Sequence, residues 1–146
     1  NGLWIHFSSD RSNQAKGFRA SWDATATGCG GMLTGPTGSI MSPNYPQPYM
    51  RYAECFFRIS VSQGSRVRLI FVDLDLEPHS RCRLDYVEVF DGVDDHSKSL
   101  GRYCTSSPSH LVSSTNHVFV KFVSDISFSG RGFHLKYYTE CNVTTR

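Results

Sequence analysis

The segment Phe71-Val-Asp-Leu-Asp-Leu-Glu77, followed closely by Cys82-Arg-Leu-Asp85, contains the pattern that decides the fold of this chain. Its two leucines alternate with three carboxylates, so an extended backbone places the leucines on one face and the acids on the other. This alternation predicts a half-buried β-strand. Its acidic end, with Asp85 beyond a turn and a cysteine, predicts a site for a hard cation, because Ca²⁺ takes oxygen ligands at about 2.3–2.6 Å.

The surrounding sequence has the two-residue periodicity of strands, and no segment shows the periodicity of a helix. Between residues 66 and 77 the phase of the apolar residues changes, from Val67, Leu69 and Phe71 to Leu74 and Leu76. One extra residue near positions 70–72 would produce this change, which predicts a β-bulge there. Many short strands separated by turn residues predict an all-β fold, a β-sandwich.

The composition limits the class of protein. The chain has 146 residues, of which 39% are hydrophobic and 13% aromatic, so it can bury a β-type core and is not disordered. A net charge of +2 with scattered basic residues argues against nucleic-acid binding, and no apolar run approaches the ~20 residues of a membrane span. Serine, histidine and aspartate are present without a nucleophile motif, so we expect no enzyme activity and no catalytic residues.

The first residues repeat a segment near the end of the chain. Residues 1–10 align with residues 116–125, and Gly17-Phe18 align at the same offset with Gly132-Phe133. A match at constant spacing predicts tandem modules. The predicted organisation is 1–22 as the C-terminal strands of a preceding module, 23–28 as a linker, 29–138 as a complete module, and 139–146 as the start of a following one.

Five cysteines have a spacing that fits neither zinc knuckles nor a redox motif: Cys29, Cys55, Cys82, Cys104 and Cys141. Two disulfides and one remaining cysteine are the natural count in an oxidising compartment. Pairing of Cys29 with Cys55 and of Cys82 with Cys104 is favoured, because each closes a loop of roughly 25 residues, a constraint worth about 3–4 kcal/mol.

Two features near the C-terminus agree with an extracellular protein. Cys141 corresponds to Cys29 in the repeat, so its partner is expected beyond residue 146; the alternative is a free or intermolecular thiol. Asn142-Val-Thr144 is a sequon for N-glycosylation, which predicts a modified Asn142.

A series of motifs in this order and spacing resembles the CUB domain over residues 29–138. The motifs are Cys29-Gly-Gly, Ser42-Pro-Asn-Tyr-Pro46, Glu54-Cys55, Cys82-x-x-Asp85-Tyr86, Val89-Phe-Asp-Gly92, Gly101-Arg-Tyr-Cys104, Phe122-x-Ser-Asp125 and Gly132-Phe133. The resemblance implies a jelly-roll-like β-sandwich of two antiparallel sheets. It also implies first-to-second and third-to-fourth disulfides, in agreement with the pairing favoured above.

The resemblance further implies a Ca²⁺ site. The acids that the family uses as ligands fall on Glu77, Asp85 and Asp125, with backbone oxygen expected near Ile126 or Ser127. Asparagine is common in the family about two residues after the last aspartate, whereas this chain has Ile126-Ser127-Phe128, so the last ligands are less well defined. The alternative interpretation of the three acids is a solvated strand end.

In the CUB family, residues at a calcium site commonly hold basic side chains of protein ligands. The expected partner-binding residues are therefore Glu77, Asp85, Asp125 and Tyr49, although Tyr49 and Tyr52 also fit a role as packed aromatics. Directly adjoining CUB modules resemble a multi-CUB endocytic receptor, extracellular or peripheral on the cell surface, whose modules also contact one another. Two alternatives are a substrate-recognition module of a tolloid-type protease or procollagen proteinase enhancer, and a carbohydrate-binding or structural module without calcium.

Overall fold

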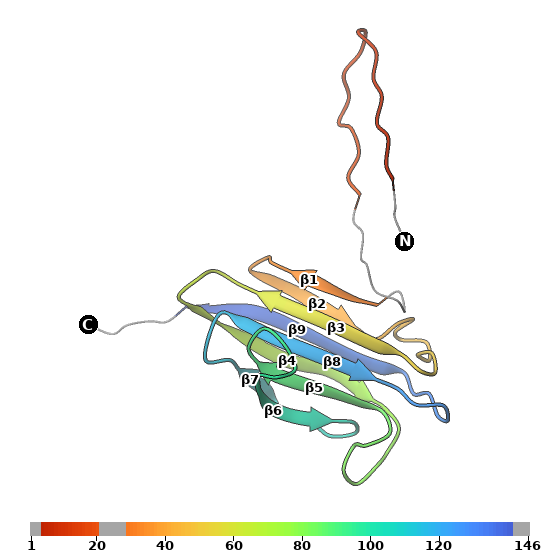
Figure 1. Cartoon of the computed structure of the whole chain (residues 1–146), viewed down its shortest axis with the longest axis vertical. Helices are drawn as coiled ribbons and strands as arrows, with labels where there is room; N and C mark the ends of the chain where they lie inside the picture. Colours follow the sequence, from red (N-terminus) through yellow and green to blue (C-terminus); the bar gives the residue numbers. More distant parts are fainter. Residues whose placement is uncertain (1–3, 21–28, 142–146) are drawn as a thin grey trace, which may run out of the picture.

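A computed structural model describes residues 4–20 and 29–141, and within them the secondary structure consists of β-strands without a helix (Figure 1). The first sheet has the order β1-β3-β8-β5-β6 and the second the order β2-β9-β4-β7. The strands are β1 (Gly30–Leu33), β2 (Thr37–Met41), β3 (Glu54–Ser60), β4 (Ser65–Asp75), β5 (Tyr86–Asp91), β6 (Lys98–Tyr103), β7 (His110–Val112), β8 (His117–Val123) and β9 (Gly132–Cys141).

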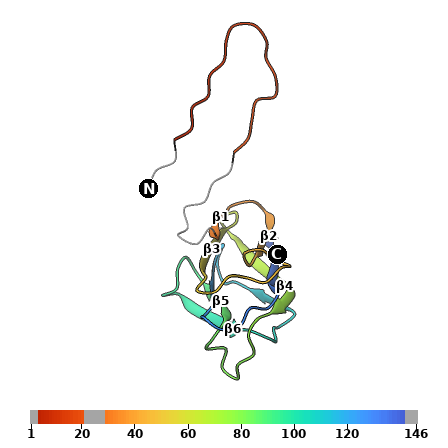
Figure 2. The ribbon, with the colours of Figure 1, turned by 90° about the vertical axis from the view of Figure 1, so that its right-hand side faces the viewer.

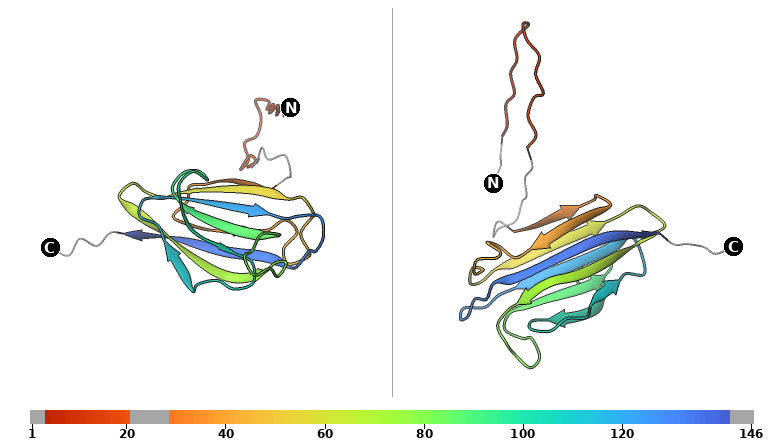
Figure 3. Two further views of the ribbon diagram at one scale, coloured as in Figure 1. Left: turned by 60° about the horizontal axis from the view of Figure 1, so that its bottom comes forward. Right: turned by 180° about the vertical axis from the view of Figure 1, so that it is seen from behind.

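The two sheets face each other as two layers, as the left-hand view of Figure 3 shows. Their facing side chains form one apolar core, in which the largest fully buried residues are Tyr137, Phe122 and Phe133. The ring of Phe133 meets the rings of Phe57 and Phe122 edge-on, at centroid distances of 6.1 and 5.2 Å. Such contacts add to the free energy gained by burying the apolar surface. The predicted all-β sandwich is confirmed.

One strand pair is parallel, a feature that the sequence pattern does not indicate. β1 pairs parallel with β3, with Gly30 opposite Phe56, and the Cys29–Cys55 disulfide joins the residues just before this register. Gly30 has a φ of +98°, and a side chain there would collide with the backbone of Phe56. A glycine directly after the cysteine therefore permits this close approach.

The predicted bulge is present in β4. Its register against β9 shifts between Phe71 and Asp73, and the extra residue, Val72, is 51% exposed. Val67 and Leu69 before the bulge are buried in the core, as is Leu76 after it. The bulge therefore keeps the apolar residues on both sides directed inward, while β4 stays paired with β9 as far as Asp75, opposite Gly132.

Both favoured disulfides are present, Cys29–Cys55 and Cys82–Cys104. Cys141 is a free, exposed thiol in the structure. It ends β9, opposite Ser65, so the strand continues three residues past the module boundary predicted at 138. Asn142 lies outside the described residues.

Residues 4–20 form no strand and lead away from the sandwich (Figures 1 and 2). Their large apolar side chains are exposed, with Trp4 at 81% and Phe18 at 62%, and Phe7 contacts Phe18 at a centroid distance of 5.5 Å. Their assignment to a preceding module stays a prediction, and the predicted linker 23–28 lies outside the described residues. Within 4–20 and 29–141, no helix has the length and apolar character needed to cross a membrane.

Candidate metal centre

Three segments bring Glu77, Asp85 and Asp125 together at the end of the sandwich where β4 and β8 terminate. Glu77 follows β4 by two residues, Asp85 directly precedes β5, and Asp125 follows β8 by two residues. One carboxylate oxygen from each lies within 4.8 Å of the others. Two oxygens on opposite sides of a Ca²⁺ ion are about 4.6–5.2 Å apart, so one ion can contact all three. The donor set, three carboxylates, also suits a hard cation.

Asp85 anchors this arrangement from inside the protein. Its side chain is fully buried, and it accepts hydrogen bonds from the Tyr49 hydroxyl at 2.5 Å and from the Asp125 backbone N–H at 2.7 Å. One carboxylate therefore holds two segments, the one that contains Tyr49 and the loop after β8. A buried acid with two strong donors is fixed in position, which suits it to be the innermost ligand of an ion.

Tyr49 is a packed aromatic, one of the two roles that the sequence left open, and its role in partner binding stays a prediction. Its ring is buried and packs edge-on against Phe122 at a centroid distance of 5.2 Å, while its hydroxyl reaches Asp85. Burial, together with the hydrogen bond to the Asp85 carboxylate, raises the pKa of Tyr49 above its ordinary value. Tyr49 therefore stays protonated and remains a donor throughout the physiological pH range. Tyr52 differs: its side chain is exposed, but its backbone N–H donates to the Asp125 carbonyl at 3.0 Å.

Ser127 joins the two outer acids. Its backbone N–H donates to Asp125 Oδ1 at 2.8 Å, and its hydroxyl lies 2.9 Å from that oxygen and 3.2 Å from each carboxylate oxygen of Glu77. A serine hydroxyl has one proton, so it can donate to only one of these acceptors at a time. Much of the negative charge of Glu77 and Asp125 is therefore not compensated by this contact. Ile126, beside them, has an exposed side chain.

The other two acids of the β4 face, Asp73 and Asp75, are not part of this cluster. The Arg131 guanidinium contacts the carboxylate of Asp73 at 3.0 Å and that of Asp75 at 3.3 Å. The hydrogen bond from Arg131 holds the pKa of Asp73 below its ordinary value. Asp73 and Asp75 are therefore paired with Arg131 and lie outside the predicted ligand set of Glu77, Asp85 and Asp125. Arg131 is 58 residues from Asp73 in the sequence, so no local pattern predicts this ion pair. The pairing of β4 with β9 brings Arg131 close to Asp73 and Asp75.

Comparison with known proteins agrees with this fold. The family model described as the CUB domain matches residues 29–137, and the chain belongs to the CUB domain family. Cubilin of Rattus norvegicus is 43% identical over 143 residues, which are 97% of this chain and 4% of cubilin. Bone morphogenetic protein 1 of Xenopus laevis is 39% identical over 145 residues, 99% of this chain and 20% of that protein. The chain thus spans a small part of each relative.

One solved structure of similar fold is a CUB domain with bound Ca²⁺. The crystal structure of the MASP-1 CUB2 domain bound to Ca²⁺ has a TM-score of 0.66 and 35% sequence identity, and the match covers 73% of this chain and 96% of that domain. The family match ends at residue 137, close to the boundary predicted at 138, whereas strand β9 itself continues to Cys141.

Proposed function

We propose that this chain is an extracellular, non-catalytic protein-binding module. In this proposal Glu77, Asp85 and Asp125 hold a Ca²⁺ ion, with backbone oxygen from Ile126 or Ser127, and the resulting acidic pocket binds lysine or arginine side chains of protein ligands. The observation that carries the proposal is the convergence of three carboxylate oxygens within 4.8 Å. The likeness to the Ca²⁺-bound MASP-1 CUB2 domain supports it.

Electrostatics gives the reason for the ion. Three close carboxylates repel one another, and a divalent cation removes that repulsion when bound. The protein supplies the geometry: Asp85 is held by Tyr49 and by the Asp125 backbone, while Ser127 ties Glu77 to Asp125. An outward oxygen of Glu77 or Asp125 can then accept a basic side chain, a contact worth about 1.5–3 kcal/mol. One such contact is weak, so useful affinity requires several modules acting together.

The proposed setting is a multi-CUB receptor that resembles cubilin and takes part in endocytosis. The identity to cubilin over nearly the whole chain supports this setting, and the two disulfides support an oxidising, extracellular compartment. Residues 1–22 and 139–146 then belong to neighbouring CUB modules, Cys141 has its disulfide partner beyond residue 146, and Asn142 is glycosylated.

Calorimetric titration of the chain with Ca²⁺ tests the metal site. We expect heat and a rise in melting temperature for the native chain, and a loss of both in Asp125→Asn, which removes one ligand charge with little change in shape. Asp95→Asn is the matched control, because Asp95 is an exposed acid paired with Lys121 and is not in the cluster. Absence of heat and of a thermal shift in millimolar Ca²⁺ would exclude the metal site and favour a structural or carbohydrate-binding module.

The basic-ligand pocket has a separate test. Binding of a lysine-containing peptide, Ac-Gly-Lys-Gly-NH2, should be weak, should require Ca²⁺, and should exceed that of the peptide with norleucine in place of lysine. A chain that binds Ca²⁺ but does not distinguish the two peptides would retain the metal site and lose the proposed recognition.

A second candidate is a substrate-recognition module of a tolloid-type extracellular protease or a procollagen proteinase enhancer. The identity to bone morphogenetic protein 1, and to tolloid-like protein 2 of Homo sapiens at 40%, favours it. The domain content of the full-length protein distinguishes the two candidates. A protease domain in the same polypeptide supports the protease module, and an array of CUB modules supports the receptor.

A further inference from the structure

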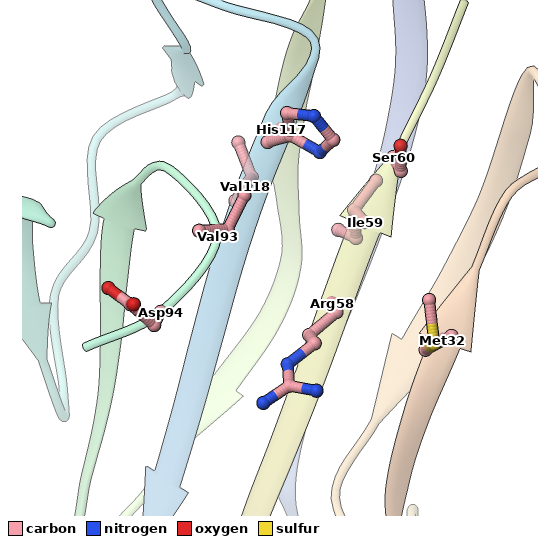
Figure 4. A pocket seen from close by; sticks show the side chains of 8 residues that line it. All are labelled: Met32, Arg58, Ile59, Ser60, Val93, Asp94, His117 and Val118. Atoms are coloured by element: carbon pink, nitrogen blue, oxygen red, sulfur yellow. The ribbon is translucent and has the colours of Figure 1, made fainter. Parts of the chain in front are cut away.

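A pocket of about 370 Å³ lies on the five-stranded sheet, and Figure 4 shows the side chains that line it. It is formed by β1, β3, the start of β8 and the loop that follows β5. Its lining includes Met32, Arg58, Ser60, Val93, Asp94 and His117. This volume is at the small end of the range of ligand sites, a size suited to one or two side chains.

Arg58 gives this pocket an uncompensated positive charge. Within the described part of the chain its guanidinium forms no ion pair or hydrogen bond, and its recorded contact is with the face of Phe119, at 5.9 Å from the ring centroid. Arg102 on the same sheet face is different, because it pairs with Glu88 at 2.8 Å and stacks on Tyr86 at 3.9 Å. The cation–π contact with Phe119 uses the face of the ring and none of the guanidinium N–H donors, which are left for a ligand.

The acid in the pocket does not neutralise Arg58. Asp94 Oδ1 accepts from the His96 backbone N–H at 3.0 Å and from the Ser97 hydroxyl at 3.2 Å. Figure 4 shows the Asp94 carboxylate turned away from Arg58, toward its own loop. The sides of the pocket are apolar and open to solvent, with Met32 72% and Val93 54% exposed. The pocket therefore offers one cation between apolar surfaces.

We propose that this pocket binds an acidic side chain, glutamate or aspartate, of a protein segment in which an apolar residue stands next to the acid. The planar guanidinium of Arg58 matches a carboxylate, and Met32 with Val93 provides a surface for the apolar neighbour. A polyanion such as a sulfated glycan fits less well. It needs several cations, whereas the lining of this pocket contains one guanidinium, that of Arg58, together with one carboxylate, that of Asp94.

This site is independent of the proposed calcium site. β8 begins at His117 in the pocket and ends at Val123, two residues before Asp125. Six residue steps along a strand span about 20 Å, so the two sites lie at opposite ends of one strand. They also select opposite charges, a carboxylate here and a lysine or arginine there. A protein ligand with separated acidic and basic residues could engage both.

Peptide titrations monitored by nuclear magnetic resonance of the nitrogen-15-labelled full chain test the proposal. The probes are Ac-Leu-Glu-Leu-NH2 and its neutral match Ac-Leu-Gln-Leu-NH2, used at millimolar concentration in EDTA so that no metal takes part. We expect amide shifts in β3, the start of β8 and residues 92–97. The glutamate peptide should bind about three- to fivefold more tightly, the size of an exposed ion pair.

Two variants assign that difference to the proposed residue. Arg58→Gln should abolish the preference for the glutamate peptide, whereas Arg102→Gln, on the same face but already paired, should retain it. The proposal is overturned if the pocket amides do not shift, if the two peptides bind equally to the native chain, or if Arg58→Gln keeps the preference. Larger pocket shifts with a sulfated heparin disaccharide than with the glutamate peptide would also overturn it, because they would identify a polyanion site.

Discussion

Replacement of Asp85 by alanine tests whether one buried carboxylate holds the loops of the candidate site. In the native chain Asp85 accepts from the Tyr49 hydroxyl and from the Asp125 backbone N–H, and it is fully buried. Alanine removes the acceptor and leaves both donors without their partner. A buried donor that loses its acceptor costs the free energy of desolvation that the hydrogen bond had offset.

The size of the expected loss in unfolding free energy follows from these contacts. Hydrogen bonds to a charged group contribute about 1.5–3 kcal/mol each, and two that share one acceptor are not independent. Removing one of three acids whose oxygens lie within 4.8 Å removes two pairwise repulsions, each of about 1 kcal/mol at the dielectric of water. We therefore expect Asp85→Ala to lower the free energy of unfolding by about 2–4 kcal/mol in the absence of metal.

Urea denaturation in EDTA measures this loss, and Asp85→Asn is the matched control. Asparagine keeps an oxygen for the Asp125 N–H, and its amide can donate to the Tyr49 hydroxyl, so we expect a loss of about 1 kcal/mol or less. In Ca²⁺ at a hundred times its dissociation constant, the native chain should gain about 2.7 kcal/mol, and both variants should gain less. If Asp85→Ala unfolds in EDTA within about 0.5 kcal/mol of the native chain, the carboxylate does not hold the loops and the reasoning fails.

Three further predictions concern the scaffold. The Arg131 hydrogen bond holds the pKa of Asp73 below its ordinary value, so its contribution to stability is present above the unfolded-state pKa of about 3.9 and is lost as the pH falls through the lowered folded-state pKa. Urea unfolding between pH 7 and pH 2 should accordingly show a smaller acid-induced loss in Arg131→Gln than in the native chain; an equal loss would contradict the ion pair. The second disulfide, Cys82–Cys104, spans 22 residues. Its removal by the double change Cys82→Ala and Cys104→Ala should lower the free energy of unfolding by about 3 kcal/mol. A loss below about 1 kcal/mol in urea would show that the loop is ordered without the disulfide. Phe133→Ala should cost about 3–5 kcal/mol in the same assay, because the ring is fully buried against two other aromatic rings, whereas a cost near that of a surface change would place the core elsewhere.

Sequence patterns were sufficient where the determining interactions are local or periodic. The alternation of apolar residues predicted strands, and the change of phase predicted a bulge near positions 70–72, because a strand must turn one face to the core along its whole length. The structure places the extra residue at Val72. The favoured pairings of Cys29 with Cys55 and of Cys82 with Cys104 are also present in the structure. The parallel pairing of β1 with β3 was not predicted, since strand pairing depends on which distant segments meet.

In the candidate site, too, some features could be predicted from the sequence and others could not. The resemblance indicated Glu77, Asp85 and Asp125 from their motifs, and the structure brings the three together. The hydrogen bond from Tyr49 to Asp85 joins residues 36 apart, and the ion pair of Arg131 with Asp73 neutralises an acid that precedes Glu77 by four residues. No local signal marks either contact.

By itself, the amino-acid sequence determined the β-class of the chain, the inward face of each strand around the bulge, and the set of acids able to bind a cation. Which acids Arg131 neutralises, which acid is buried beside Tyr49, and that Arg58 has no ion pair among the described residues are features of the tertiary structure alone. The physical reason is the difference in sequence range between the two kinds of interaction. Side-chain alternation is a property of a few consecutive residues, whereas the charge balance of a site depends on which distant segments the sheet topology places within hydrogen-bonding distance.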